Sequence, residues 1–268
     1  MMQRRHHLAA LGAMLVAGRA GAQSDSVKIG VILPMTGPQA STGRQIDAAV
    51  KLFMAQNGGK VAGKKFEVIV KDDAGVPDTT RRLAQELVVN DKVAVIAGFG
   101  LTPSALAAAP IATQSKTPLV VMAAGTSSIT EASPFVTRTS VTLPQVAVGM
   151  AEWSNKNGIK KVMTLVADYG PGIDAEKFYA DRVTLNGGSV LEKVRTPLRS
   201  PDFAPMLQKV RDLKPDALFV FLPSGQGAPF MKQFVERGLD KLGVRLIGSG
   251  EITDDDQLAE IGDVALGL

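Results

Sequence analysis

The stretch VAVIAGFGLTPS, residues 93–104, sets the pattern from which the fold of this chain follows. It begins with an apolar run without polar alternation, which indicates a strand buried on both faces, as in a parallel sheet covered by helices. A glycine-rich turn follows, and Pro103 stands in the first turn of an expected helix, where its missing N–H does no harm. We therefore predict a strand, a tight turn and a helix in succession, the repeating unit of an α/β fold.

The same alternation of apolar strand and amphipathic helix extends in both directions from this stretch. It begins at Val27, is interrupted at 135–142, and then continues to Ile247. We interpret 135–142 as the crossing between two lobes, each a parallel sheet flanked by helices. The predicted strands are 27–33, 66–70, 93–97, 119–122, 161–167, 189–194, 217–222 and 244–247. The predicted helices are 43–56, 78–89, 103–114, 144–157, 174–186, 202–213 and 228–237, with Asp202 as an N-cap.

The first 22 residues carry the three-part pattern of an export signal. Arg4 and Arg5 precede an apolar run at 8–18, and Ala20-Gly21-Ala22 supplies the small residues that a signal peptidase requires. The run is too short to span a bilayer, which takes about 20 apolar residues, so the protein is not expected to be inserted in the membrane. We expect a periplasmic protein whose mature form begins near Gln23. Two alternatives stay open, a buried N-terminal core helix and a twin-arginine signal.

Loss of this signal changes the chemistry that the chain offers. Residues 1–22 contain three arginines and no acid, so the formal charge falls from +4 to +1 and no basic block remains to bind nucleic acid. Both histidines, His6 and His7, leave with the signal, and the chain contains no cysteine. The usual zinc sites and the Ser-His or Cys-His catalytic sets are thereby excluded. We expect neither a cofactor nor a metal.

A ligand is expected beyond the carboxyl ends of the strands, where loops lead into the next helices. We predict that Thr102 is the N-cap of the helix in the opening stretch. A helix start with unpaired amides and a hydroxyl suits a carboxylate, and the turn 124–128 carries further hydroxyls after the next strand. The alternative is that Thr102 only caps its own helix. The predicted ligand loops are 34–43, 98–102, 123–128, 168–172, 223–227 and 248–253.

Other motifs in the sequence are weaker. Gly98-Phe99-Gly100 begins like a dinucleotide fingerprint, but Pro103 stands at the third glycine position, and no Gly-Lys-Ser/Thr phosphate loop occurs. The acidic groups Asp72-Asp73 and 254–256 do not have the spacing of a calcium loop. We interpret both groups as solvated loop and helix-cap carboxylates.

A series of short motifs is specific in its order and spacing. The motifs are VKIGV (27–31), PMTGP (34–38), NGG (57–59), DD (72–73), VIAG (95–98), DYG (168–170) and IGD (261–263). Together they resemble the leucine/isoleucine/valine-binding protein family, the periplasmic receptors of branched-chain amino acid type ABC transporters. The resemblance covers the chain from Val27 to its last residue. It implies a two-lobed type I periplasmic binding protein fold.

The resemblance also implies a ligand site between the lobes. In that family a Ser or Thr after the third strand and a small-residue turn after the fourth hold the ligand carboxylate. These positions are Thr102, and Ala124 with Thr126. A second-lobe tyrosine that closes on the ligand falls on Tyr169, and an acid that takes the ligand ammonium falls on or beside Glu251.

Two departures from the leucine receptor indicate an altered side-chain pocket. The first-loop aromatic residue is Thr42 here, and a second-lobe aromatic residue is replaced by the shorter segment 223–226. Relatives of this kind also bind amides, urea derivatives or aromatic acids. We therefore expect a small carboxylate-bearing ligand (an amino acid, an amide or an aromatic acid) and an inner-membrane ABC permease as the partner.

The expected organisation is a signal peptide at 1–22, a first lobe at 23–142, a second lobe at 143–250 and the start of a return to the first lobe at 251–268. Since proteins of the family continue well beyond this point, we expect a monomer truncated at its C-terminus, with apolar surface exposed on the first lobe.

Two other functions stay open. An exported enzyme could use Asp168, Tyr169 and Glu251, although it would need a base with a displaced pKa. The ligand-sensing half of a regulator would share the fold.

Overall fold

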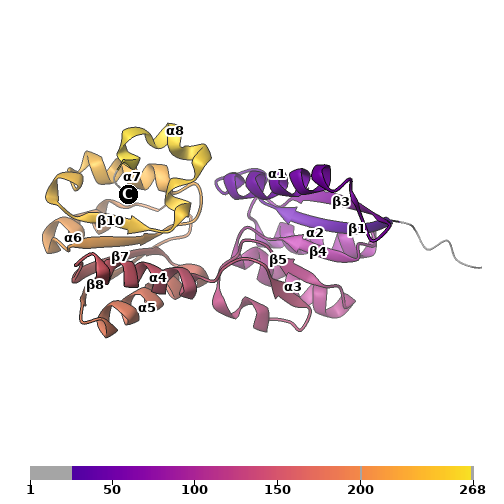
Figure 1. Ribbon diagram of the computed structural model, residues 1–268, viewed down its shortest axis with the longest axis horizontal. Helices are drawn as coiled ribbons and strands as arrows, with labels where there is room; N and C mark the ends of the chain where they lie inside the picture. The colour runs from indigo at the N-terminus through magenta and orange to yellow at the C-terminus, as the bar shows by residue number, and fades with distance from the viewer. Residues whose placement is uncertain (1–25, 200, 267–268) are drawn as a thin grey trace, which may run out of the picture.

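The computed structural model describes residues 26–199 and 201–266, which form two α/β lobes (Figure 1). The predicted signal at 1–22 and the predicted mature start at Gln23 lie outside these residues. The first lobe has the strand order β2-β3-β1-β4-β5-β6, in which only β2 is antiparallel to its neighbour. Its strands are β1 (Ser26–Leu33), β2 (Lys60–Val61), β3 (Lys64–Asp72), β4 (Val95–Gly98), β5 (Leu119–Val121) and β6 (Val136–Arg138). Its helices are α1 (Ala40–Gln56), α2 (Pro77–Val89), α3 (Thr102–Ser115) and the 3-10 helix η1 (Ser127–Glu131).

The second lobe is a parallel sheet with the order β10-β9-β7-β8. Its strands are β7 (Lys161–Ala167), β8 (Ser189–Thr196), β9 (Ala217–Phe221) and β10 (Arg245–Gly248). Its α-helices are α4 (Leu143–Lys156), α5 (Gly170–Leu185), α6 (Ala204–Leu213), α7 (Gly227–Glu236) and α8 (Leu258–Ile261). Its 3-10 helices are η2 (Asp240–Leu242), η3 (Gly250–Thr253), η4 (Asp255–Gln257) and η5 (Gly262–Ala265).

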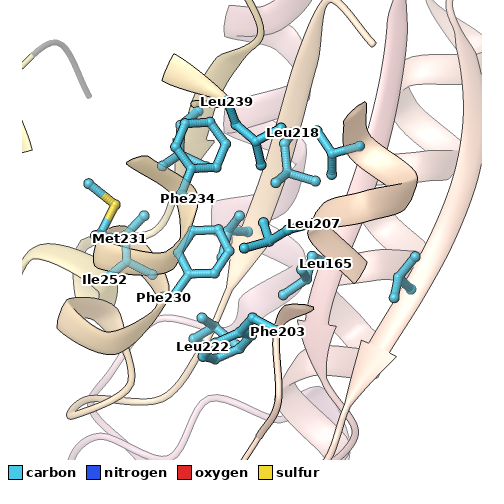
Figure 2. Packing of buried hydrophobic residues seen from close by; sticks show 14 of the residues in the cluster. Leu165, Phe203, Leu207, Leu218, Leu222, Phe230, Met231, Phe234, Leu239 and Ile252 are labelled. Carbon is cyan, nitrogen blue, oxygen red and sulfur yellow. The ribbon is translucent and has the colours of Figure 1, made fainter. Parts of the chain in front are cut away.

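Helices cover the second-lobe sheet on both faces, which is why the central strands β7 and β9 are almost entirely apolar, whereas the edge strand β8 carries several charged residues. On one face α6 and α7 pack Leu207 and Phe230 against Leu165 and Leu218 of the sheet (Figure 2). On the other face Tyr179 of α5 stacks on Phe219, with ring centroids 4.0 Å apart and planes 7° from parallel. The continuous apolar runs therefore predicted this sheet correctly.

The first-lobe sheet is less evenly covered. Helices α2 and α3 pack on one face, where Leu87 and Ile96 are fully buried. On the other face an apolar hollow of about 470 Å³ remains between α1 and the sheet. Leu52 and Phe53 on α1 are 58% and 56% exposed, so part of the apolar surface of this helix has no cover within the described residues.

The segment 135–142 leads from the first-lobe sheet to α4, but it also contains the edge strand β6, which was not predicted. Only one of its three residues is aliphatic, and its pairing with β5 is what makes it a strand, as in Leu119↔Val136. A second correction concerns Asp202, which is not the N-cap of α6. Phe203 holds that position, and the Asp202 carboxylate accepts a hydrogen bond from the Ala204 amide at 3.0 Å.

The interpretation of Asp72-Asp73 as solvated carboxylates is wrong for Asp73, which is fully buried. Its carboxylate accepts hydrogen bonds from the Thr80 hydroxyl at 2.6 Å, the Ser104 hydroxyl at 3.0 Å and the Gly75 amide at 2.9 Å. Thr80 belongs to α2 and Ser104 to α3. The buried carboxylate therefore ties the first turns of two neighbouring helices together.

The prediction that 251–268 begins a return to the first lobe stays a prediction, since the described residues of this segment still belong to the second lobe. They lie against α7, and Ile252 and Ile261 are buried in the second-lobe core (Figure 1). Among the described residues, no helix has both the length and the apolar character that a membrane span requires.

Candidate ligand-binding site

The structure brings the six predicted site residues together between the lobes. Five of them line one small cavity of about 80 Å³, and the sixth, Thr126, is hydrogen-bonded to one of the five. The five are Thr42, Thr102, Ala124, Tyr169 and Glu251. Because these residues are far apart in sequence, their convergence results from the carboxyl ends of parallel strands meeting at one edge of each sheet.

A pair of threonine hydroxyls forms the first-lobe wall of the cavity. The Oγ1 atoms of Thr102 and Thr126 are 2.7 Å apart, and the two residues are only 4% and 8% exposed. The prediction that Thr102 is an N-cap is wrong, since Leu101 holds that position and no side chain caps the helix. The Thr102 hydroxyl bonds to Thr126 instead, at the N-terminus of α3. A buried hydroxyl pair at a helix N-terminus favours an anion.

The two turns that carry these threonines are held side by side by their backbones. The Ala124 amide donates to the Phe99 carbonyl at 3.1 Å, so this amide is already used and Ala124 contributes only shape to the cavity. The Arg138 guanidinium donates to the carbonyl of Thr126. These bonds hold the turn that carries the Thr126 hydroxyl in place without a ligand.

The second-lobe wall is aromatic and acidic. The rings of Tyr169 and Phe221 stack with centroids 6.2 Å apart and planes 22° from parallel. Burial, and secondarily the negative charge of Glu251, raise the pKa of Tyr169, so its hydroxyl stays protonated at neutral pH. One carboxylate oxygen of Glu251, Oε2, is buried without a hydrogen-bond partner in the described structure. A buried acceptor of this kind is costly unless a ligand supplies the donor.

Several further lining residues were not singled out from the sequence. Gln39 and Ser224 lie in loops that were predicted to face the ligand, but nothing in a single sequence distinguishes them from their loop neighbours. Leu143 begins α4, and Phe221 lies at the end of an apolar strand. Phe221 supplies an aromatic ring close in sequence to the segment 223–226, which replaces a second-lobe aromatic residue of the leucine receptor.

The residues of the enzyme hypothesis do not form one site. Asp168 does not line the cavity, its side chain is 57% exposed, and it pairs with Arg195 at 3.4 Å. Burial, with the charge of Glu251, raises the pKa of Tyr169, so even less of its hydroxyl is deprotonated and available as a base at neutral pH than in an ordinary tyrosine. Within the described residues no cluster of acidic side chains is arranged to hold a metal ion. The arrangement as a whole suits binding of a small ligand.

A larger groove of about 500 Å³ adjoins the small cavity between the lobes and shares Gln39 and Leu101 with it. Its walls are mostly proline and aliphatic side chains, partly from the loops after β3 and β8, which do not line the small cavity, with Arg199 and Gln226 as the polar members of the second lobe.

Comparisons with known proteins agree with this geometry. A family model described as "Periplasmic binding protein" matches residues 26–268. "Leu/Ile/Val-binding protein homolog 6" of Brucella abortus (strain 2308) is 42% identical over 97% of this chain and 67% of its own length.

Among solved structures, a solute binding protein of an ABC transporter from Rhodopseudomonas palustris BisB5, in complex with 3,4-dihydroxybenzoic acid, is similar at 61% identity with a TM-score of 0.87. The match covers 91% of this chain and 67% of that one. A counterpart from R. palustris HaA2 in complex with p-hydroxybenzoic acid is 40% identical, with the same TM-score and coverage.

Proposed function

From the fact that the chain belongs to the periplasmic binding protein family, we propose that it captures a hydroxylated benzoate between its two lobes for an inner-membrane ABC transporter. The ligand carboxylate lies at the hydroxyl pair of Thr102 and Thr126, where the N-terminus of α3 stabilises negative charge. The ring lies near Tyr169 and Phe221. A ring hydroxyl donates to Glu251.

The observation that carries this proposal is that one cavity holds a pair of hydroxyl donors on one side and an unpaired carboxylate acceptor on the other. Hydroxyl donors at a helix start accept a carboxylate, whereas the unpaired Glu251 oxygen requires a donor and repels a second anion. Similar proteins at 61% and 40% identity were solved with hydroxylated benzoic acids, which carry both groups.

An amino acid of the leucine type is the second candidate. Its ammonium group would also satisfy the Glu251 carboxylate, and the relative at 42% identity is named a Leu/Ile/Val-binding protein homolog. The two candidates differ in the group that donates a hydrogen bond to Glu251, which is a neutral ring hydroxyl in one case and a charged ammonium group in the other.

A calorimetric and thermal-shift panel of benzoate, 4-hydroxybenzoate, 3,4-dihydroxybenzoate and leucine tests the proposal. A ligand present at a hundredfold its Kd stabilises the protein by about 2.7 kcal/mol. We expect the two hydroxybenzoates to bind more tightly than benzoate. In Glu251→Gln this advantage should shrink by about tenfold, because a charged acceptor is replaced by a neutral one, while the affinity for benzoate changes little. Binding of leucine alone would favour the second candidate, and no binding by any of the four would refute the proposal.

Residues 1–22 direct export in this proposal, and the mature protein works in the periplasm without changing its ligand chemically. N-terminal mass spectrometry of protein recovered from the periplasm of a Gram-negative host should give a start near Gln23. The bound ligand, once extracted, should be recovered unaltered and in a molar ratio of about one. A ligand converted with turnover would support the enzyme hypothesis instead.

A further inference from the structure

At two of the contacts between the lobes, the second lobe presents a glycine. Gly225, in the loop between β9 and α7, lies against the backbone of Pro38 in the loop between β1 and α1. A Cβ atom at Gly225 would stand 2.0 Å from the Pro38 carbonyl oxygen. Gly170, the first residue of α5, faces Thr126, and a Cβ there would stand 2.5 Å from Thr126 Oγ1. Neither glycine leaves room for a side chain when the lobes are together.

The Gly225 contact joins two backbones, so no side-chain rotation can relieve a clash at this point. The Pro38 loop is fixed in its own lobe, because the Asp72 carboxylate accepts hydrogen bonds from the Met35 amide at 2.9 Å and the Thr36 hydroxyl at 2.7 Å. Burial alone would raise the pKa of Asp72, but these bonds outweigh it and lower that pKa, so the anchor stays charged at neutral pH.

The Gly225 side of the contact is also held in place. The amide of Gln226 donates to the Pro223 carbonyl at 3.2 Å and closes the turn, while its side-chain amide donates to the Leu198 carbonyl at 2.8 Å. Gly225 has φ +86° in this turn, a conformation that glycine adopts without strain. Two braced loops therefore meet at a point where only a hydrogen atom fits.

We propose that Gly225 sets how far the lobes close, and that its bare Cα is what allows the rim of the ligand cavity to shut. This inference rests on the proposed receptor function, in which the lobes close around a ligand. The residues next to the contact, Ser224 and Gln39, line the cavity itself. A side chain at 225 would hold these two walls apart and leave the cavity open to solvent.

The test compares Gly225→Ala with Gly158→Ala. Gly158 lies in the same lobe with φ +73°, but a Cβ there would have nothing within 4 Å. Alanine is strained at both positions, so both variants should lose similar stability in the ligand-free state. Only Gly225→Ala should weaken 4-hydroxybenzoate binding, by about tenfold or more. The reason is that the added Cβ clashes with Pro38 only when the lobes are closed. The loss should appear in the dissociation rate, since association depends on the open form.

A second pair of variants keeps the test decisive if alanine at 225 rearranges its turn. Gly170 does not have a positive φ, so Gly170→Ala adds the clash with Thr126 without that strain. Its control is Gly149→Ala on α4, where a Cβ would meet nothing within 4 Å. Faster dissociation in Gly170→Ala but not in Gly149→Ala supports closure limited by these glycine contacts.

Closure can also be measured without relying on the ligand assignment. The chain contains no cysteine, so Ala48→Cys on α1 and Glu236→Cys on α7, both exposed, allow specific fluorescent labelling of the two lobes. Energy transfer should report a closed population in the wild type that Gly225→Ala lacks, with and without 4-hydroxybenzoate. If the wild type binds none of the benzoates, the proposed ligand is wrong while the ligand-free comparison still decides this inference. Equal closed populations in Gly225→Ala and the wild type would overturn it.

Discussion

Thr102 and Thr126 hold a hydrogen bond between their own hydroxyls, so in the ligand-free cavity one of the two protons is already engaged. A carboxylate with two oxygens can accept from both hydroxyls only if this bond is exchanged for bonds to the ligand. The pair therefore acts as one unit, in which each hydroxyl holds the other in position. Their effects on binding are expected to be coupled.

Thr102→Val and Thr126→Val each keep the shape of the side chain and remove one donor. Each should weaken binding of 4-hydroxybenzoate by about tenfold to a hundredfold, the worth of one hydrogen bond to a charged group. The double variant should lose less than the sum of the two free energies, because the residues share a bond. Calorimetric titration measures this, with Thr137→Val on the exposed side of β6 as a control that should bind normally. Unchanged affinity in both single variants would remove the carboxylate site.

At the scale of single elements, strands and helices that face a hydrophobic core could be predicted from the sequence, because burial requires apolar residues in them. The strand at 161–167 matches β7 at both ends, since every residue after Lys161 is buried. Strand β6 was missed, because its extended form depends on pairing with β5, which no local pattern contains. The convergence of Thr102 and Thr126 was predictable from the rule that ligands bind beyond strand ends. Their mutual hydrogen bond was not, since it depends on the distance between two loops.

The role of Asp73 could not be predicted from the sequence either. A carboxylate after a strand is solvated in most proteins and becomes buried only when neighbouring helices pack over it. Here α2 and α3 do so, and both contribute hydroxyl donors. Since Ser104 follows Thr102 by two residues, the same carboxylate helps to fix the start of α3 at the cavity.

Asp73→Ala should therefore lower both stability and ligand affinity. It leaves the buried hydroxyls of Thr80 and Ser104 without their shared acceptor, and we expect the free energy of unfolding to fall by about 2 kcal/mol or more. Urea denaturation measures this loss. The matched control is Asp181→Ala on α5, whose carboxylate is 59% exposed and pairs only with Lys177, and which should change stability by less than about 1 kcal/mol. Equal effects of the two substitutions would contradict the structural role of Asp73.

At the scale of the whole molecule, the only two tyrosines of the chain, Tyr169 and Tyr179, both lie in the second lobe. Burial raises the pKa of Tyr179 to about 12, in spite of an opposing hydrogen bond with Ser154, and it also raises that of Tyr169. Below pH 10 both tyrosines are neutral in the folded and the unfolded chain, and their ionisation does not affect stability. Above pH 10 the tyrosine hydroxyls lose their protons in the unfolded chain but not yet in the folded chain, so the second lobe loses stability as pH rises.

We therefore expect a spectrophotometric titration at 295 nm to show no tyrosinate until the protein unfolds in alkali. Between pH 10 and about 12 the free energy of unfolding should fall by about 1.4 kcal/mol per pH unit for Tyr179 alone. Circular dichroism followed in parallel separates ionisation from unfolding. Tyrosinate that forms with a pKa near 10 while the native spectrum persists would show that the rings are not protected.

The walls of the ligand cavity are loops that follow different strands, with Gly100 after β4, Ala124 after β5, Tyr169 after β7 and Ser224 after β9. A mutation in one of these loops leaves the register of both sheets intact, because the strands are held by their own backbone pairing and by helices on their faces. Substitutions in one loop can therefore change which ligand the cavity accepts while both sheets keep their register. The residues that select the ligand are thus separate from the strand residues that hold the two sheets together.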